Sequence, residues 1–306
     1  MRKAQAWAPA GLSGFFVPRI TNDLRTTGAA GGGVGIEEGV SVEVRVYESE
    51  QTIIENYING RPLESRLVGY IVKRLLEKKP SINPPYKIVV DQKISVPIGG
   101  GYGTSGASAL AVSIALAKAL RARVTLNDIA TIAHEADIVN KTGLGTVVGI
   151  LGCCGGIVIV EEPGGPGVAK TNSIMLEDDL RILTLFYGAR SKEAILSNAQ
   201  GLKDISNIGS KALEKILEDP TPETFIEQCR WFAEATGLMT PAVKEVVREL
   251  EKTRGVLGAS MTMIGDAVFA IVEKEEAEEA LKIASQARKP VWTYVGRPFG
   301  WLLNGF

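Results

Sequence analysis

The stretch from Pro97 to Ala107 reads PIGGGYGTSGA and separates an expected strand from an expected buried helix. Its glycines at 99, 100, 101 and 103 let the backbone approach a ligand closely and turn N–H groups inward. Thr104, Ser105 and Ser108 stand at the start of the helix, where free N–H groups and the helix dipole favour an anion. The stretch therefore predicts a phosphate-binding loop or, in a purely structural reading, a tight turn with Ser/Thr capping.

Two common nucleotide-binding loops do not fit this stretch. No lysine follows the last glycine, which excludes a Walker A loop. The glycine spacing differs from that of a dinucleotide-binding fingerprint, and no strand ending in an acidic residue follows at the expected distance.

The segments around the loop predict a mixed fold. Strict alternation predicts a strand over 40–47, and apolar runs predict a strand over 86–96 and a buried helix over 104–121. Helices are also expected over 66–78 and 127–140, the second capped by Asn127 and Asp128. Residues 28–35 (GAAGGGVG) predict a flexible loop. Residues 147–160 predict strand material interrupted by glycine.

A rigid turn, PGGPG at 163–167, precedes a second set of elements. Strands are expected over 181–187, 267–272 and 291–295, with helices over 191–253 and 274–287. Helices over a sheet indicate an α+β fold. We place a domain boundary between residues 172 and 173, which gives an N-terminal domain of 1–172 and a C-terminal domain of 173–306.

The composition argues against several classes of protein. With 34 Lys and Arg against 35 Asp and Glu, the net charge of −1 gives no reason to expect a nucleic-acid partner. No apolar stretch reaches the ~20 residues of a membrane span, and no signal peptide is evident. Three cysteines make neither a disulfide framework nor a zinc site, and a single histidine excludes a His-rich metal site. A cytoplasmic protein is expected.

Three motifs carry a resemblance to a known family. PIGGGYGTSGA resembles the phosphate loop of the GHMP kinase superfamily, commonly written PxxxGLGSSAA. Ala8-Pro9 resembles the motif that lines the substrate site in that family. The segment Gly258 to Ala270 (GASMTMIGDAVFA) resembles its C-terminal glycine-containing loop. Within the superfamily, GFF at 14–16, AHEAD at 133–137, TGLG at 142–145 and PGGPG resemble the archaeal-type pantoate kinases.

The resemblance implies a fold, a reaction and a set of site residues. The fold is α+β, with a ribosomal protein S5 domain 2-like N-terminal domain and a ferredoxin-like C-terminal domain. The reaction is transfer of phosphate from Mg-ATP to the terminal hydroxyl of pantoate, a small hydroxy acid, on the route to coenzyme A. A homodimer is the expected assembly. The residues expected to bind ATP are Pro97, Gly99, Gly100, Gly101, Gly103, Thr104, Ser105, Gly106, Ala107 and Ser108.

The remaining expected site residues surround the reacting groups. The resemblance implies Ser105, Asp137 and Thr146 as catalytic positions, and Ser105 and Asp137 as ligands of Mg²⁺. Ser13, His134 and Ser191 are the candidates around the substrate.

The acidic metal ligand has two candidates on the helix over 127–140. His134 and Asp137 are three residues apart and share a face, whereas Glu135 points elsewhere. The pantoate kinase pattern resembles HxAE, which selects Asp137. An alignment to mevalonate kinases selects Glu135 instead.

Several positions depart from the pantoate kinase pattern. Thr146 stands where an aspartate is expected, and threonine does not act as a base at neutral pH. Ala29 and Ala30 replace a serine and an arginine, and the strand ending at Val160 lacks an expected arginine. Arg19, Arg25 and Arg190 are candidate replacements for that cation. A kinase for a mevalonate-like alcohol or its phosphate, and a weakly active paralogue that binds a nucleotide or metabolite, are therefore alternative hypotheses.

Overall fold

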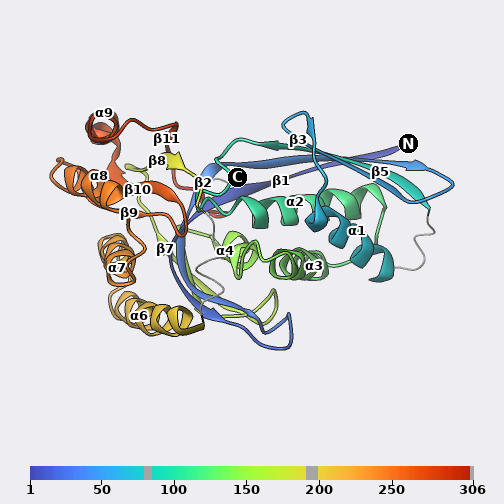
Figure 1. The fold of residues 1–306 in the computed structure, drawn as a ribbon, viewed down its shortest axis with the longest axis horizontal. Helices are drawn as coiled ribbons and strands as arrows, with labels where there is room; N and C mark the ends of the chain where they lie inside the picture. Colours follow the sequence, from blue (N-terminus) through green and yellow to red (C-terminus); the bar gives the residue numbers. More distant parts are fainter. Residues whose placement is uncertain (79–84, 191–198, 304–306) are drawn as a thin grey trace.

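A computed structural model of the protein describes residues 1–78, 85–190 and 199–303 (Figure 1). The first part of the chain contains β1 (Arg2–Arg19), β2 (Gly28–Glu48), β3 (Ile53–Ile58), β4 (Arg61–Pro62), α1 (Arg66–Lys78), β5 (Tyr86–Ile94), α2 (Thr104–Ala119), α3 (Leu126–Val139), α4 (Thr146–Gly152), β6 (Gly156–Glu162) and β7 (Lys170–Met175). The second part contains β8 (Leu180–Gly188), α6 (Ala199–Glu218), α7 (Pro222–Ala235), α8 (Pro241–Glu251), β9 (Val256–Met261), β10 (Asp266–Glu273), a 3-10 turn (Lys274–Glu276), α9 (Ala277–Ala287) and β11 (Trp292–Gly296).

Strand β2 is the centre of the first sheet. Among the described residues the strand order is β4-β3-β5-β2-β6-β7, and β1 pairs with β2 along nearly its whole length. The far half of β2 pairs with β5, whereas its glycine-rich first half pairs with β6. Register shifts in β1 at Pro9/Ala10 and Ser13/Phe15 accompany the curvature of the two long blue strands in Figure 1.

Helix α2 forms the core of the first part. Its residues are buried on almost every side, because the helix lies between β1, β2 and α3. Helices α1 and α3 pack beside it, so three helices cover one face of the sheet (Figure 1). Burial on all sides explains why the sequence of α2 is apolar without a polar stripe.

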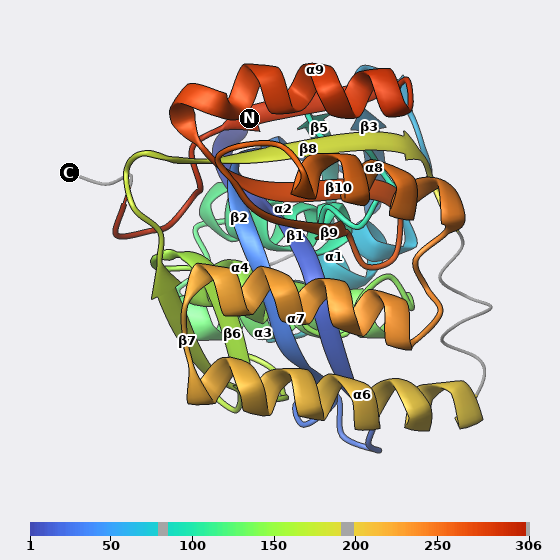
Figure 2. The ribbon, with the colours of Figure 1, turned by 90° about the vertical axis from the view of Figure 1, so that its left-hand side faces the viewer.

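The second sheet has the order β11-β8-β10-β9, and each pair of neighbouring strands is antiparallel. Helices α7 and α8 pack against β9, and α9 packs against β8 and β10. Helix α6 lies against β1 and α7, which ties the second part to the first (Figure 2). This arrangement confirms the predicted α+β fold.

Three local predictions were wrong. Residues 28–35 form the first part of strand β2, because their glycines allow close approach to β1. Residues 146–152 form helix α4, and the strand begins only at Gly156. The N-cap of α3 is Thr125, whose hydroxyl accepts from Asp128 N–H while the Asp128 carboxylate accepts from Thr125 N–H.

The predicted boundary between residues 172 and 173 stays a prediction, and it falls within β7. Strand β7 pairs with β6 in the first sheet through Met175. The last residues of the first sheet therefore lie just after the predicted boundary.

Candidate active site

The loop from Pro97 to Gly103 leads from β5 into α2. Gly99, Gly101 and Gly103 have positive φ angles of 78°, 82° and 63°, which glycine adopts without strain. A β-carbon at Gly103 would lie 2.9 Å from Thr146 Cγ2, so the loop and α4 are in close contact. The tight path of this loop requires glycine at these positions.

The start of α2 is suited to an anion. Its N-cap, Gly103, makes no side-chain capping bond, whereas α3, α7 and α8 are capped by threonine hydroxyls. The first N–H groups of α2 are therefore not used by a capping side chain. Together with the helix dipole, such N–H groups favour an anion at this end of α2.

The loop is bonded to the second part of the chain. The Thr262 hydroxyl donates to Gly100 O at 2.5 Å, and Tyr102 Oη lies 2.8 Å from Thr184 Oγ1. Tyr102 is fully buried, and burial raises the pKa of its phenol, which stays protonated. On the other side of the loop, Ser13 N–H donates to Gly101 O. These bonds fix the loop between β1 and the second sheet.

Asp137 and Ser105 meet at the loop after α3. The Thr142 hydroxyl donates to Asp137 Oδ1 at 2.6 Å, and the Ser105 hydroxyl donates to Thr142 O at 3.3 Å. A β-carbon at Gly143 would lie 2.2 Å from Asp137 Oδ2 and 2.9 Å from Thr146 Oγ1. The structure thus brings together the predicted residues Ser105, Asp137 and Thr146.

Glu135 lies on another side of α3. Its carboxylate accepts a hydrogen bond from Arg74 Nε at 3.0 Å and from Tyr70 Oη at 3.1 Å, both on α1. This bond to Glu135 raises the pKa of Arg74. Glu135 therefore joins α3 to α1, as the predicted difference in helix face requires.

His134 is buried away from the loops just described. Its Nε2 lies 3.0 Å from Thr27 O, and a β-carbon at Gly165 would lie 2.8 Å from its Cδ2. The ring thus contacts the segment before β2 and the PGGPG turn, and it is absent from the described cavity lining. Its predicted contact with substrate stays a prediction. Ser191, the third predicted substrate residue, lies outside the described residues.

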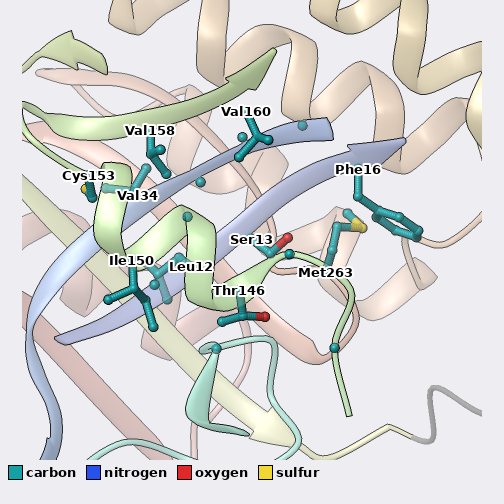
Figure 3. Close-up of a pocket in the computed structure, with 18 of the residues that line it drawn as sticks. Leu12, Ser13, Phe16, Val34, Thr146, Ile150, Cys153, Val158, Val160 and Met263 are labelled. Atoms are coloured by element: carbon teal, nitrogen blue, oxygen red, sulfur yellow. The ribbon is translucent and has the colours of Figure 1, made fainter. Parts of the chain in front are cut away.

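A cavity of about 160 Å³ opens beside the phosphate loop. Its described walls come from β1, β2, α4, β6, the turn between β9 and β10, and Phe299 (Figure 3). The polar side chains in that lining are Ser13, Thr146 and the Cys153 thiol, and the rest are apolar or glycine. Burial raises the pKa of Cys153 to about 11, so this thiol is protonated at neutral pH. The cavity therefore suits a small carbon skeleton that carries a hydroxyl group.

The sequence did not indicate most of this lining. Its apolar end contains Val34, Ile150, Cys153 and Val158 (Figure 3). The glycines at 28–35 were the sequence feature that could have indicated the wall at β2, but they predicted a flexible loop. The three predicted replacement cations, Arg19, Arg25 and Arg190, are not in the described lining.

Oxygen donors at Ser105 and Asp137 fit a magnesium ion. Mg²⁺ prefers oxygen ligands and is commonly held by one or two protein groups plus phosphate oxygens and water. Among the residues described, no group of three or more His, Cys, Asp or Glu side chains is placed to hold a metal. The available donors thus suit an ion that arrives with a nucleotide.

Comparison with known proteins decides the family. The model of the GHMP kinases N terminal domain matches residues 66–151, and that of the GHMP kinases C terminal matches residues 211–289. A pantoate kinase of Thermococcus kodakarensis is 35% identical over 295 residues, 94% of this chain and 93% of its own. The chain belongs to the GHMP kinase family.

Other comparisons agree with this assignment. A pantoate kinase of Methanocaldococcus jannaschii is 32% identical and covers 90% of this GHMP kinase and 96% of its own chain. The solved structure of a "phosphotransferase related to CoA biosynthesis pathway" has a TM-score of 0.86 at 32% identity, covering 97% and 96% of the two chains. Mevalonate diphosphate decarboxylase from Staphylococcus aureus has a TM-score of 0.70 at 15% identity, covering 98% and 96%, and shares the fold.

Family membership confirms several predictions. This GHMP kinase is a phosphotransferase that acts on a hydroxyl group of a small molecule, and ATP is its phosphate donor. No helix within the described ranges has both the length and the apolar character needed to cross a bilayer.

Proposed function

We propose that this GHMP kinase transfers the γ-phosphate of ATP to the terminal hydroxyl of pantoate, forming 4-phosphopantoate and ADP. The carrying observation is that Ser105 and Asp137 both bond to Thr142, in the loop whose following residues, Gly143 to Thr146, line a largely apolar cavity. Two relatives that are named pantoate kinase, both above 30% identity over at least 90% of this chain, support the choice of substrate.

The phosphates of ATP are proposed to bind residues 97–108. The uncapped start of α2 supplies N–H donors, and the glycines of the loop leave room for close approach. Ser105 and Asp137 would hold Mg²⁺, which supplies positive charge to the phosphate oxygens. Asp137 is chosen over Glu135 because Glu135 already binds Arg74 and Tyr70.

The hydroxyl of pantoate would attack from the cavity. One oxygen–phosphorus bond forms at the terminal phosphate, and the bond to the bridging oxygen of ADP breaks. No side chain of residues 142–146 accepts the proton at neutral pH, so the proton of the attacking hydroxyl passes to a phosphate oxygen or to water. Phosphoryl transfer depends mainly on positioning and on stabilisation of charge, which the α2 terminus and Ser105 provide.

A substrate panel tests this proposal. The purified protein receives Mg-ATP with pantoate, mevalonate, homoserine or 2,4-dihydroxybutanoate, and ADP release is followed while the product is identified by phosphorus NMR. Pantoate is expected to give the highest kcat/KM, with phosphate on its terminal oxygen. A preference for mevalonate would favour the alternative substrate. Tight ATP binding without turnover of any acid would favour the weakly active paralogue.

The proposal includes a requirement for Mg²⁺ and a dimeric assembly. Activity should vanish when a chelator removes Mg²⁺ and return when it is added back. We also expect a homodimer, which light scattering on the eluting protein measures directly.

A further inference from the structure

Residues 29–35 of β2 line one wall of the cavity, and four of them are glycines. Gly31, Gly33 and Gly35 are two residues apart, so they face the same side of the sheet. A β-carbon at Gly35 would lie 2.9 Å from Cys153 Sγ, which places this face toward the end of α4. A β-carbon at Gly32 would instead lie 2.8 Å from Phe225 Cε2, on the side of α7. A β-carbon at Gly31 or Gly33 would lie within 2.6 Å of a backbone oxygen of β1, so these positions add no side chain to the wall of the cavity.

The neighbouring strand β6 adds two valines to the same face. Gly31 pairs with Val160 and Gly33 pairs with Val158. Both valines line the cavity and are 6% exposed. A β-carbon at Gly149 of α4 would lie 3.9 Å from Val158 Cγ1, so this valine also touches the opposite wall.

The two ends of the cavity differ in chemistry. Ser13 and Thr146 lie toward one end, near the phosphate loop, whereas Cys153 and Val158 lie at the other (Figure 3). Val160 lies along the wall between them (Figure 3). A substrate that presents its hydroxyl to Thr146 therefore places its carbon skeleton against the valines.

We infer that Val158 and Val160 select a substrate whose hydroxymethyl group is attached to a fully substituted carbon. In pantoate this carbon bears two methyl groups, next to the phosphorylated CH₂OH. The glycine face leaves room for these methyl groups, and the valines supply a stiff apolar wall, since a β-branched side chain in a strand has few rotamers. This inference rests on the proposed function and adds the residues that set its specificity.

The expected preference is measurable. A single methylene in an apolar pocket changes discrimination by about 10- to 200-fold. The protein should therefore prefer pantoate to 2,4-dihydroxybutanoate, which lacks both methyl groups, by at least about tenfold in kcat/KM.

Three variants and a matched control test the inference. Val158→Ala and Val160→Ala should lower the preference for pantoate by roughly tenfold and raise the relative activity on the 3,3-diethyl homologue. Val160→Thr keeps the side-chain shape but adds a hydroxyl, and should also lower the preference. Ile159→Val is the control, because Ile159 lies on the opposite face of β6, where its Cδ1 is 3.1 Å from a β-carbon built at Gly32. The control should leave the preference unchanged.

The possible outcomes distinguish failure of the proposed function from failure of the inference about Val158 and Val160. Wild-type protein that phosphorylates no pantoate overturns the proposed function, and the inference with it. Wild-type activity on pantoate combined with an unchanged preference in folded Val160→Ala and Val160→Thr variants overturns the inference alone. A changed preference in Ile159→Val would also count against it, because the effect would then come from general loosening of β6.

Discussion

The hydroxyl of Thr142 donates a hydrogen bond to Oδ1 of Asp137 across a distance of 2.6 Å. Asp137 is buried near the end of α3, and the same loop accepts a hydrogen bond from Ser105 at Thr142 O. Thr142 thus links the two residues proposed to hold the metal. Its side chain fixes the direction of the carboxylate without being a ligand in the proposal.

Removal of the Thr142 hydroxyl should reduce turnover. Thr142→Val retains the shape of the side chain but loses the bond to Asp137, and we expect kcat to fall about tenfold or more while KM for ATP changes less. Thr142→Ser should restore most of kcat. A valine variant with normal kcat would show that Asp137 is oriented by other contacts.

The two acidic residues of α3 should respond differently. Asp137→Ala should lower kcat by at least about a hundredfold. The variant loses a proposed ligand of Mg²⁺, and with it the positive charge that stabilises the transferring phosphate. Glu135→Gln should retain kcat but lower the free energy of unfolding by about 1–3 kcal/mol, because the charged bond to Arg74 is weakened. Steady-state kinetics and urea denaturation on both proteins check this pair. The reverse pattern would support the alignment that selects Glu135.

Ser105 should matter for the nucleotide and not for the fold. Ser105→Ala removes a hydroxyl at the start of α2 that donates a 3.3 Å hydrogen bond to Thr142 O. We expect kcat/KM for Mg-ATP to fall about tenfold or more, with a thermal midpoint close to that of the wild type. Ser113→Ala, further into α2 and outside the residues proposed to bind ATP, is the comparison variant.

Thr146 should tolerate loss of its hydroxyl. Thr146→Ala should change kcat by less than about tenfold, because threonine does not take the proton of the substrate. Thr146→Asp introduces a carboxylate at the position where the family resemblance expects one, and should raise kcat on pantoate. Complete loss of activity in a folded, ATP-binding alanine variant would contradict a mechanism without a side-chain base.

His134 should make stability depend on pH. Burial lowers the pKa of His134 from its reference value of 6.5, against smaller opposing effects of its hydrogen bonds and nearby carboxylates. Below pH 6.5 the unfolded chain takes up a proton that the folded protein resists, so the free energy of unfolding should fall as the pH decreases further. His134→Gln should show a flatter dependence in urea titrations at pH 7.5 and 5.5. Parallel curves for the two proteins would refute the assignment.

The sequence predicted the elements whose burial gives them a simple residue pattern, either an apolar run or a regular alternation. The apolar run of α2, the alternation in the far half of β2 and the strands of the second sheet were recognised because burial determines their residue types. The helix faces of Asp137 and Glu135 were also predictable from their spacing. The structure brings Ser105, Asp137 and Thr146 together as the motifs implied.

The cavity could not be predicted in the same way. Residues 28–35 look flexible because glycine is permissive, and only the pairing of β2 with β1 and β6 shows that Gly31 and Gly33 lie beside Val160 and Val158 in a sheet. Helix α4 is short and rich in β-branched residues, a composition that local propensity assigns to a strand. Contacts between segments distant in the sequence determine that residues 28–35 form a strand and that residues 146–152 form a helix.

The loop over residues 97–103 is hydrogen-bonded to both sheets. It is bonded to β1 through Ser13 and Gly101, and to the second sheet through Tyr102 with Thr184 and through Thr262 with Gly100. Met263 N–H also donates to Ser13 O at 2.7 Å, which closes the connection around the loop. A motion that separates the two sheets at this point must either break these bonds or carry the loop along. Widening of the gap between the sheets and displacement of the loop that is proposed to hold the nucleotide are therefore one coupled movement.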